Sequence, residues 1–149
     1  MPEKLKQYID RYFTFILGFV FVLLTLLAWS NRFIQDDAFI SYRYAANFAD
    51  GHGLVWNIGE RVEGYTNFLW TLIVSIPFFL RTDPVGFSHL VGLVCFILTL
   101  AVTYRISLSF SGSRYRALLA VVLLGTNFSF SAYATGGMET QLQTLLFTC

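Results

Sequence analysis

Apolar residues gather into three long runs, at residues 12–30, about 85–108 and about 115–134. Each run is long enough to cross the hydrocarbon core of a bilayer as a helix, which takes about 20 residues. Aromatic residues stand at or near the ends of these runs, as in the interfacial belts of membrane proteins: Tyr12, Trp29, Tyr104, Tyr115 and Tyr133. The pattern predicts an all-α, polytopic membrane protein.

A fourth apolar run, at 68–80, is short for a span and contains Pro77, which favours an interfacial or re-entrant helix. If this run lies flat on the membrane, six of the ten Lys and Arg residues fall on the N-terminal side and four on the other side. If it spans, those numbers are reversed. Because basic residues concentrate on the cytoplasmic side, the flat arrangement is favoured, with the N-terminus cytoplasmic. Residues 31–83 then form one large outer loop.

Within that loop, residues 38–49 are expected to form a second interfacial helix. Its apolar residues fall near one face: Phe39, Tyr42, Ala46 and Ala49. Asp36 or Asp37 is placed to cap the start of this helix, and Gly51 and Gly53 are placed to end it.

Composition supports the membrane class. The chain is 56% hydrophobic and 13% charged, about half the charge of a typical soluble domain. The net charge of +1 gives no indication of a nucleic-acid partner, and the two cysteines imply no disulfide framework. The first apolar run is long for a signal peptide, so we expect an uncleaved span. The last residues form an apolar, helix-like run, which is the pattern expected of a truncated, longer protein.

Asp36 and Asp37 are the first candidates for chemistry, because they are adjacent carboxylates at the point where the first span reaches water. A helix cap explains one of them well and the second poorly. Adjacent like charges repel, a cost that is tolerated where a cation, a metal or a catalytic task is present. Arg43 follows on the same short helix, and its guanidinium suits either a lipid phosphate or the phosphate of a substrate.

Two other groups of polar residues leave alternatives open. Glu60, Arg61 and Glu63 form either a solvated loop with local ion pairs or part of a binding site. Glu139 ends a Gly-Gly-Met-Glu turn that follows the third span, and it either caps a helix or brings a third carboxylate to the side where the aspartates lie. Three acids at one interface could hold a divalent cation such as Mg²⁺ or Mn²⁺ through oxygen ligands.

Three motifs occur in a distinctive order: Asp36-Asp-Ala-Phe-Ile-Ser-Tyr-Arg-Tyr-Ala45, then Gly51-His-Gly-Leu54, then Glu60-Arg-Val-Glu-Gly-Tyr-Thr66. Residues 36–70 resemble the first outer loop of the GT-C superfamily, polytopic glycosyltransferases that use polyprenyl-phosphate sugars. The likeness is greater to bacterial members related to mycobacterial terminal arabinofuranosyltransferases than to aminoarabinose transferases and protein O-mannosyltransferases. It returns at Thr135-Gly-Gly-Met-Glu-Thr140 and covers the front part of such an enzyme.

The resemblance implies a GT-C transmembrane fold with two juxtamembrane helices in the first outer loop, in the plasma membrane with that loop outside. It also implies an inverting hexosyl- or pentosyltransferase that moves a lipid-linked sugar to a glycan, lipid or protein acceptor of the cell envelope. Asp36 would be the general base, and Asp37 its partner in orientation or metal binding. Arg43 would meet the donor phosphate, and Glu139 would be a second-loop acid that some relatives use with a metal. The loop motif would supply the substrate-binding residues Glu60, Arg61, Glu63 and Tyr65. The fragment alone would be inactive.

A second hypothesis is a non-catalytic polytopic protein, either a transporter or an assembly scaffold. Transport paths are marked by ionisable residues within the spans. The centres of the three expected spans contain none, which favours the enzyme.

Overall fold

The computed structural model describes residues 3–60, 62 and 64–149, and every regular element within them is a helix. This confirms the all-α class. In chain order the elements are α1 (Glu3–Ser30), α2 (Ala38–Ala49), α3 (Phe68–Phe79), α4 (Pro84–Ser111), α5 (Arg114–Gly125), α6 (Phe128–Ala132), the 3₁₀ helix η1 (Tyr133–Thr135) and α7 (Thr140–Thr148).

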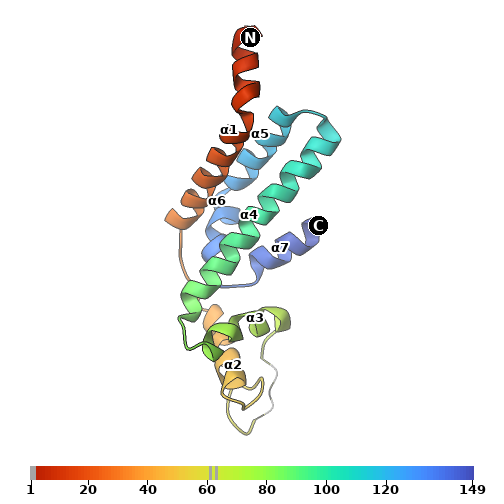
Figure 1. The fold of residues 1–149 in the computed structure, drawn as a ribbon. Helices are drawn as coiled ribbons and strands as arrows, with labels where there is room; N and C mark the ends of the chain where they lie inside the picture. The colour runs from red at the N-terminus through yellow and green to blue at the C-terminus, as the bar shows by residue number, and fades with distance from the viewer. Residues whose placement is uncertain (1–2, 61, 63) are drawn as a thin grey trace.

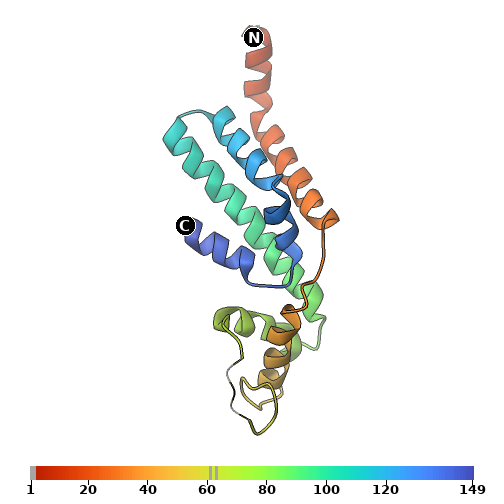
Figure 2. The same cartoon turned by 180° about the vertical axis from the view of Figure 1, so that it is seen from behind.

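The molecule has two parts, a bundle of long helices and a smaller layer at one end of it (Figure 1). α1, α4 and α5 lie side by side, and α2 and α3 lie beyond the end of the bundle that is farthest from the N-terminus, as the view from behind also shows (Figure 2). Residues 10–30 and 84–111 are long and apolar enough to cross a membrane. If α1 crosses, the N-terminus and the α2–α3 layer lie on opposite sides.

The third expected span is not one continuous helix. α5 ends at Gly125, and the direction of the chain changes by 72° before α6 and η1. The break occurs because Asn127 adopts an extended conformation (φ −61°, ψ 121°) and its side-chain oxygen accepts a hydrogen bond from the Phe130 N–H. Asn127 therefore starts a new helix inside an apolar run, which the expectation of a single helix over 115–134 missed.

The sequence sets the limits of α4 at both ends. The Asp83 carboxylate accepts hydrogen bonds from the Val85 and Gly86 N–H groups, and Pro84 occupies the first helical position, where its missing donor has no cost. Gly112 ends the helix with a left-handed φ of 62°, a conformation that glycine adopts without strain. The turn that follows carries the chain back towards the N-terminal half of α1, where Arg114 forms a 3.1 Å ion pair with Asp10.

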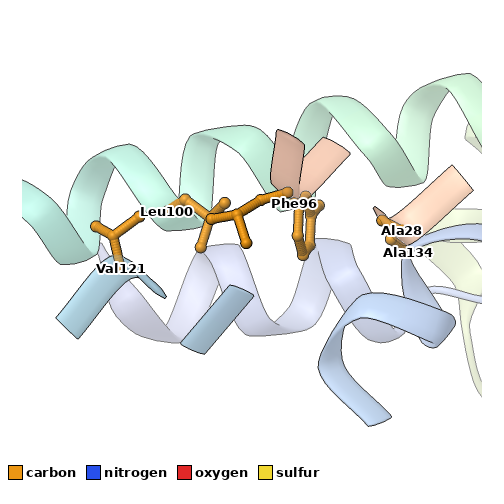
Figure 3. Close-up of a cluster of buried hydrophobic side chains, with 6 residues drawn as sticks. Ala28, Phe96, Leu100, Val121 and Ala134 are labelled. Atoms are coloured by element: carbon orange, nitrogen blue, oxygen red, sulfur yellow. The ribbon is translucent and has the colours of Figure 1, made fainter. Parts of the chain in front are cut away.

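The core of the bundle is a cluster shared by α1, α4, α5 and η1 (Figure 3): Leu24, Ala28, Phe96, Leu100, Val121 and Ala134. Glycine lets two of these elements approach closely. A Cβ atom at Gly92 of α4 would lie 2.2 Å from the Ala134 carbonyl oxygen of η1. The outward faces are apolar too, with Phe15 75% and Phe110 89% exposed, as expected for helices that face lipid.

The α2–α3 layer has a core of its own, made of Ala38, Tyr42, Ala45, Trp70 and Val74. α3 has 12 residues and runs across the end of the bundle, packed on α2, rather than along the long helices (Figure 1). This position fits a helix that lies at the membrane surface. The helix expected at 38–49 is present as α2, and the one expected at 68–80 is present as α3.

Candidate functional site

The two aspartates lie at the start of α2, and neither caps the helix through its side chain. Asp37 is the N-cap residue but has helical angles (φ −63°, ψ −21°) and makes no side-chain capping bond. A capping residue normally has an extended backbone that turns its side chain towards the helix. Instead, backbone turns start α2, with the Ala38 N–H bonded to the Gln35 carbonyl and the Phe39 N–H to that of Asp36. The expected side-chain cap was therefore wrong.

Asp36 and Asp37 are both exposed. The described part of the chain offers neither carboxylate a hydrogen bond or an ion pair. Since capping does not occupy them, both are free to accept protons or hydrogen bonds from a bound molecule.

A cavity of about 260 Å³ lies beside the aspartates. Three segments far apart in the sequence form it, namely the start of α2, the loop before α3 and the turn before α7. Its lining residues are Asp37, Ile40, Ser41, Gly64, Tyr65, Thr66, Asn67 and Met138. Asp37 and Tyr65 are therefore brought together, whereas Asp36 is not part of the lining. We call this space the Asp37 cavity.

The turn that contains Glu139 is tied to the same region by three hydrogen bonds. The Gly136 carbonyl accepts from the Gln35 N–H at 3.0 Å, and the Gly137 carbonyl accepts from the Trp70 indole N–H at 3.1 Å. Glu139 Oε2 accepts from the Asn67 side-chain amide at 2.8 Å. The third acid therefore lies at the same end of the molecule as the aspartate pair, one hydrogen bond away from a residue that lines the Asp37 cavity.

Gly137 allows this close approach. Its φ is 79°, and a Cβ atom there would lie 2.3 Å from Ile34 Cδ1 and 3.0 Å from Ala38 Cβ. Both the backbone conformation and the lack of space require glycine. The turn is thus fitted against the segment that carries Asp36 and Asp37.

A cation site made from the three acids alone is not formed. Among the residues that the structure describes, no group of three or more His, Cys, Asp and Glu side chains is arranged to hold a metal ion. Asp36, Asp37 and Glu139 share one end of the molecule without converging on one point. The donor set expected for Mg²⁺ or Mn²⁺ is therefore not assembled by these side chains.

The other expected binding residues have separate positions. The Arg43 Nε–H donates to the Trp56 carbonyl at 3.2 Å. Glu60 accepts from the Asn57 amide at 3.0 Å and lines a second cavity, of about 330 Å³, next to the Asp37 cavity. Arg43 lines neither cavity. Arg61 and Glu63 lie outside the described residues. The expected binding set is thus divided between the two cavities and a contact that fastens the loop.

Several residues that organise the site were missed in the sequence. The Asn47 amide, which is buried, donates to the carbonyls of Val55 at 2.7 Å and Trp56 at 3.0 Å. The Tyr44 hydroxyl donates to the Val62 carbonyl at 3.0 Å. Tyr44 and Asn47 are three positions apart on α2, so their common face could have been read from the helical period. Together they fasten the loop between α2 and α3.

Tyr42 joins the two parts of the molecule. Its hydroxyl and the Ser88 hydroxyl of α4 form a 2.6 Å hydrogen bond. Burial raises the pKa of Tyr42, and the bond to Ser88 partly offsets this shift. The phenol is thus neutral at physiological pH and serves as a hydrogen-bonding link rather than a charged group.

Comparisons with known proteins give a short, consistent similarity. The chain is 41% identical over 49 residues to a terminal beta-(1->2)-arabinofuranosyltransferase of Mycobacterium tuberculosis, which covers 33% of this chain and 8% of that protein. It is 45% identical over 48 residues to the enzyme of the same name from Corynebacterium glutamicum, covering 32% of this chain and 7% of that protein. No family model matches, and no solved structure matches.

The chain spans less than a tenth of the length of the curated relatives it matches. The similarity therefore supports a coarse relation to arabinofuranosyltransferases over about a third of this chain. The long apolar helices are those expected of a membrane protein, and the proteins that the chain resembles over this stretch are glycosyltransferases.

Proposed function

We propose that this chain supplies the first outer loop of a membrane glycosyltransferase, which moves a sugar from a polyprenyl-phosphate donor to an acceptor in the cell envelope. The observation that carries the proposal is a pair of exposed, unpartnered carboxylates on the segment that follows a membrane-length helix, one of which, Asp37, lines a cavity. The similarity to two arabinofuranosyltransferases supports the reaction class. In this proposal the N-terminus is cytoplasmic and the α2–α3 layer lies on the outer face of the plasma membrane.

The reaction is an inverting displacement. A carboxylate takes the proton from an acceptor hydroxyl, and the hydroxyl oxygen forms a bond to the anomeric carbon of the donor sugar. The bond from that carbon to the phosphate oxygen breaks, and the phosphate leaves with the electron pair on its lipid. The base must lie within hydrogen-bond reach of the hydroxyl, and Asp37 is exposed at the wall of a cavity next to which such a hydroxyl can bind.

The resemblance and the cavity lining favour different aspartates as the general base. The resemblance assigns the base to Asp36, whereas the lining of the cavity includes Asp37. The proposal therefore uses the pair as a unit, and single substitutions assign the roles. Tyr65 lines the same cavity, and its neutral hydroxyl suits a hydrogen bond to a sugar hydroxyl, whereas the lining residues Ser41 and Asn67 are bonded to each other.

Arg43 and a metal ion have limited roles in this proposal. Arg43 bonds to the Trp56 carbonyl through its Nε–H and lines neither cavity, so its contact with the donor phosphate stays a prediction from the resemblance. No step of the mechanism uses a metal ion, because the acids do not form a donor set.

Single amide substitutions in the full-length protein test the proposal. Transfer from polyprenyl-phosphate arabinofuranose and polyprenyl-phosphate mannose is measured for Asp36→Asn and Asp37→Asn in purified, reconstituted protein. Loss of a general base lowers kcat by about 10²–10⁴-fold, so we expect at least one variant to fall by that factor with an unchanged unfolding temperature.

Asp50→Asn is the matched control, because Asp50 is also exposed and lies at the other end of α2. We expect it to keep wild-type activity. Wild-type transfer by both Asp36→Asn and Asp37→Asn would rule out the acid-pair mechanism. A wild-type protein that transfers neither sugar would favour a non-catalytic role, as a transporter or scaffold.

A further inference from the structure

A second cavity lies next to the Asp37 cavity, and its mostly apolar lining includes two aromatic rings and the polar side chains of Asn57 and Glu60. It has a volume of about 330 Å³ and is lined by Ile40, Tyr44, Trp56, Asn57, Glu60, Val62 and Gly64. Ile40 and Gly64 line both cavities, so the two share a wall. We call this space the Trp56 cavity. Its volume falls at the lower end of the range for small-molecule sites.

The aromatic wall of the Trp56 cavity is held in place before any ligand binds. Tyr44 is 1% exposed, and its hydroxyl is bonded to the Val62 carbonyl. The Trp56 backbone is held by the Asn47 amide and by the Arg43 guanidinium. The rings of Tyr44 and Trp56 lie 5.9 Å apart, and Trp56 is 41% exposed. The wall therefore combines a fixed backbone with an open aromatic face.

The polar groups of this cavity suit a neutral polyhydroxyl ligand. Asn57 donates to one oxygen of Glu60, which leaves the other carboxylate oxygen and the Asn57 carbonyl as acceptors. The charged side chain in the described part of the lining is the Glu60 carboxylate, which suits a ligand that donates hydrogen bonds. Sugar rings match this environment, since their C–H faces pack on aromatic rings while their hydroxyls bond to polar groups.

The position of the cavity separates it from the lipid donor. The loop that carries Trp56 and Glu60 is the part of the α2–α3 layer farthest from the long helices (Figures 1 and 2). The Asp37 cavity includes Met138, from the turn that joins the bundle to α7. A donor held in the bilayer reaches the Asp37 cavity first, whereas a ligand from the aqueous phase reaches the Trp56 cavity.

We infer that the Trp56 cavity binds a sugar ring of the acceptor glycan. Binding there places the acceptor hydroxyl that neighbours this ring in the Asp37 cavity. The binding of a sugar is inferred from the lining of the cavity alone. That this sugar belongs to the acceptor rests on the proposed function. Trp56 supplies the stacking face, and Glu60 and Asn57 accept hydrogen bonds from ring hydroxyls.

Steady-state kinetics test the acceptor role, with Trp56→Ala and Trp56→Phe in the full-length protein. Loss of an aromatic contact is expected to raise the acceptor KM about tenfold and to leave kcat and the donor KM unchanged. Trp56→Phe should restore most of the affinity. Ile58→Ala is the matched control, because Ile58 is 67% exposed on the same loop and lies outside the lining.

A binding measurement without transfer separates this inference from the proposed function. Saturation-transfer NMR with methyl arabinofuranoside and methyl mannopyranoside should show ring protons in contact with the wild type and with Ile58→Ala. The contact should be lost in Trp56→Ala. This result would support sugar binding even if the protein transferred no sugar.

Three results would overturn the inference. They are a sugar contact that survives in Trp56→Ala, a donor KM that rises in place of the acceptor KM, and a fall in kcat at unchanged KM values. A loss of kcat in Asp36→Asn or Asp37→Asn alone concerns the proposed function and leaves the Trp56 cavity untouched.

Discussion

The bundle and the α2–α3 layer are both built from apolar helices, but they are held together differently. In the bundle, most hydrogen bonds from side chains run to the carbonyl one turn earlier, as from Thr25 to Phe21 and from Thr99 to Cys95. In the α2–α3 layer, polar side chains join distant segments, as between Asn67 and Glu139, or between Trp70 and Gly137. The first part depends on close packing and the second on specific polar contacts.

In the proposed placement, with the bundle in the membrane and the α2–α3 layer at its surface, this difference follows from the solvent around each part. In hydrocarbon, helices gain little from burying apolar surface against one another, so small residues and close approach hold them together. At a membrane surface, water competes for every polar group, and a hydrogen-bonded frame is needed to fix a loop in one conformation. Ionised carboxylates are stable only in the second environment, which explains why the candidate chemistry is placed there.

The largest effect is expected from adding a methyl group at Gly92 in the bundle. Gly92→Ala would place a Cβ atom 2.2 Å from the Ala134 carbonyl oxygen, so α4 and η1 must move apart. Such overpacking costs about 3 kcal/mol. We expect a clearly lower unfolding temperature in detergent and reduced transfer activity, because η1 leads directly into the Glu139 turn.

Gly18→Ala provides the matched control for that experiment. No atom lies within 4 Å of a Cβ at Gly18, so this helical substitution should be neutral or slightly stabilising. Equal unfolding temperatures for Gly92→Ala and the wild type would show that close approach does not hold the bundle.

An intermediate effect is expected from Asn67→Asp in the α2–α3 layer. The substitution keeps the shape, removes the amide that donates to Ser41 and Glu139, and places a second carboxylate beside Glu139. Losing these partly buried bonds costs about 2 kcal/mol. Chemical denaturation should show this loss near neutral pH, and acidification should restore part of it, since protonation of one carboxyl removes the repulsion.

Asn57→Asp is the comparison for that variant, since its bond to Glu60 is exposed. We expect its stability to change by about 0.5 kcal/mol or less. If both variants lost the same stability, the polar frame around Asn67 would have no special role.

The smallest effect is expected from Arg114→Gln, which removes an ion pair within the bundle. Arg114 pairs with Asp10 at 3.1 Å and lies over the Phe13 ring, but the two side chains are 42% and 30% exposed. Pairs this exposed contribute between about 0 and 1 kcal/mol. Arg114→Gln should therefore lower stability slightly, less so at high salt, with transfer activity unchanged. A tenfold loss of activity would instead mean that this end of the bundle is coupled to the site.

Much of the fold could be predicted because hydropathy and helix signals are local. The apolar runs mark α1 and α4, and the Asp83-Pro84 pair and Gly112 mark the ends of α4. α2 was recognisable from the face on which its apolar residues fall. The break at Asn127 was missed because one amide has little weight in a long apolar run, whereas its capping bond to Phe130 redirects the chain.

The site was predictable only in part, because its contacts are not local. The sequence indicated that Glu139 and the aspartates would share one side of the membrane. It carried no sign that Asn67 would hold Glu139, since these residues are 72 positions apart. Nor could it show that the Asp37 backbone is helical, which frees the carboxylate from capping. Such outcomes depend on how separate helices meet.

The hydrogen bond between Gln35 and the Gly136 carbonyl has a consequence for the spacing of residues along the chain. An α-helix turns by about 100° for each residue, so one residue inserted into α5 would rotate everything that follows it. The Glu139 turn would then miss both its backbone partner and Asn67. Substitutions on the lipid-facing side of α5 should thus be tolerated far better than any insertion or deletion between the Gly112 turn and Gly136.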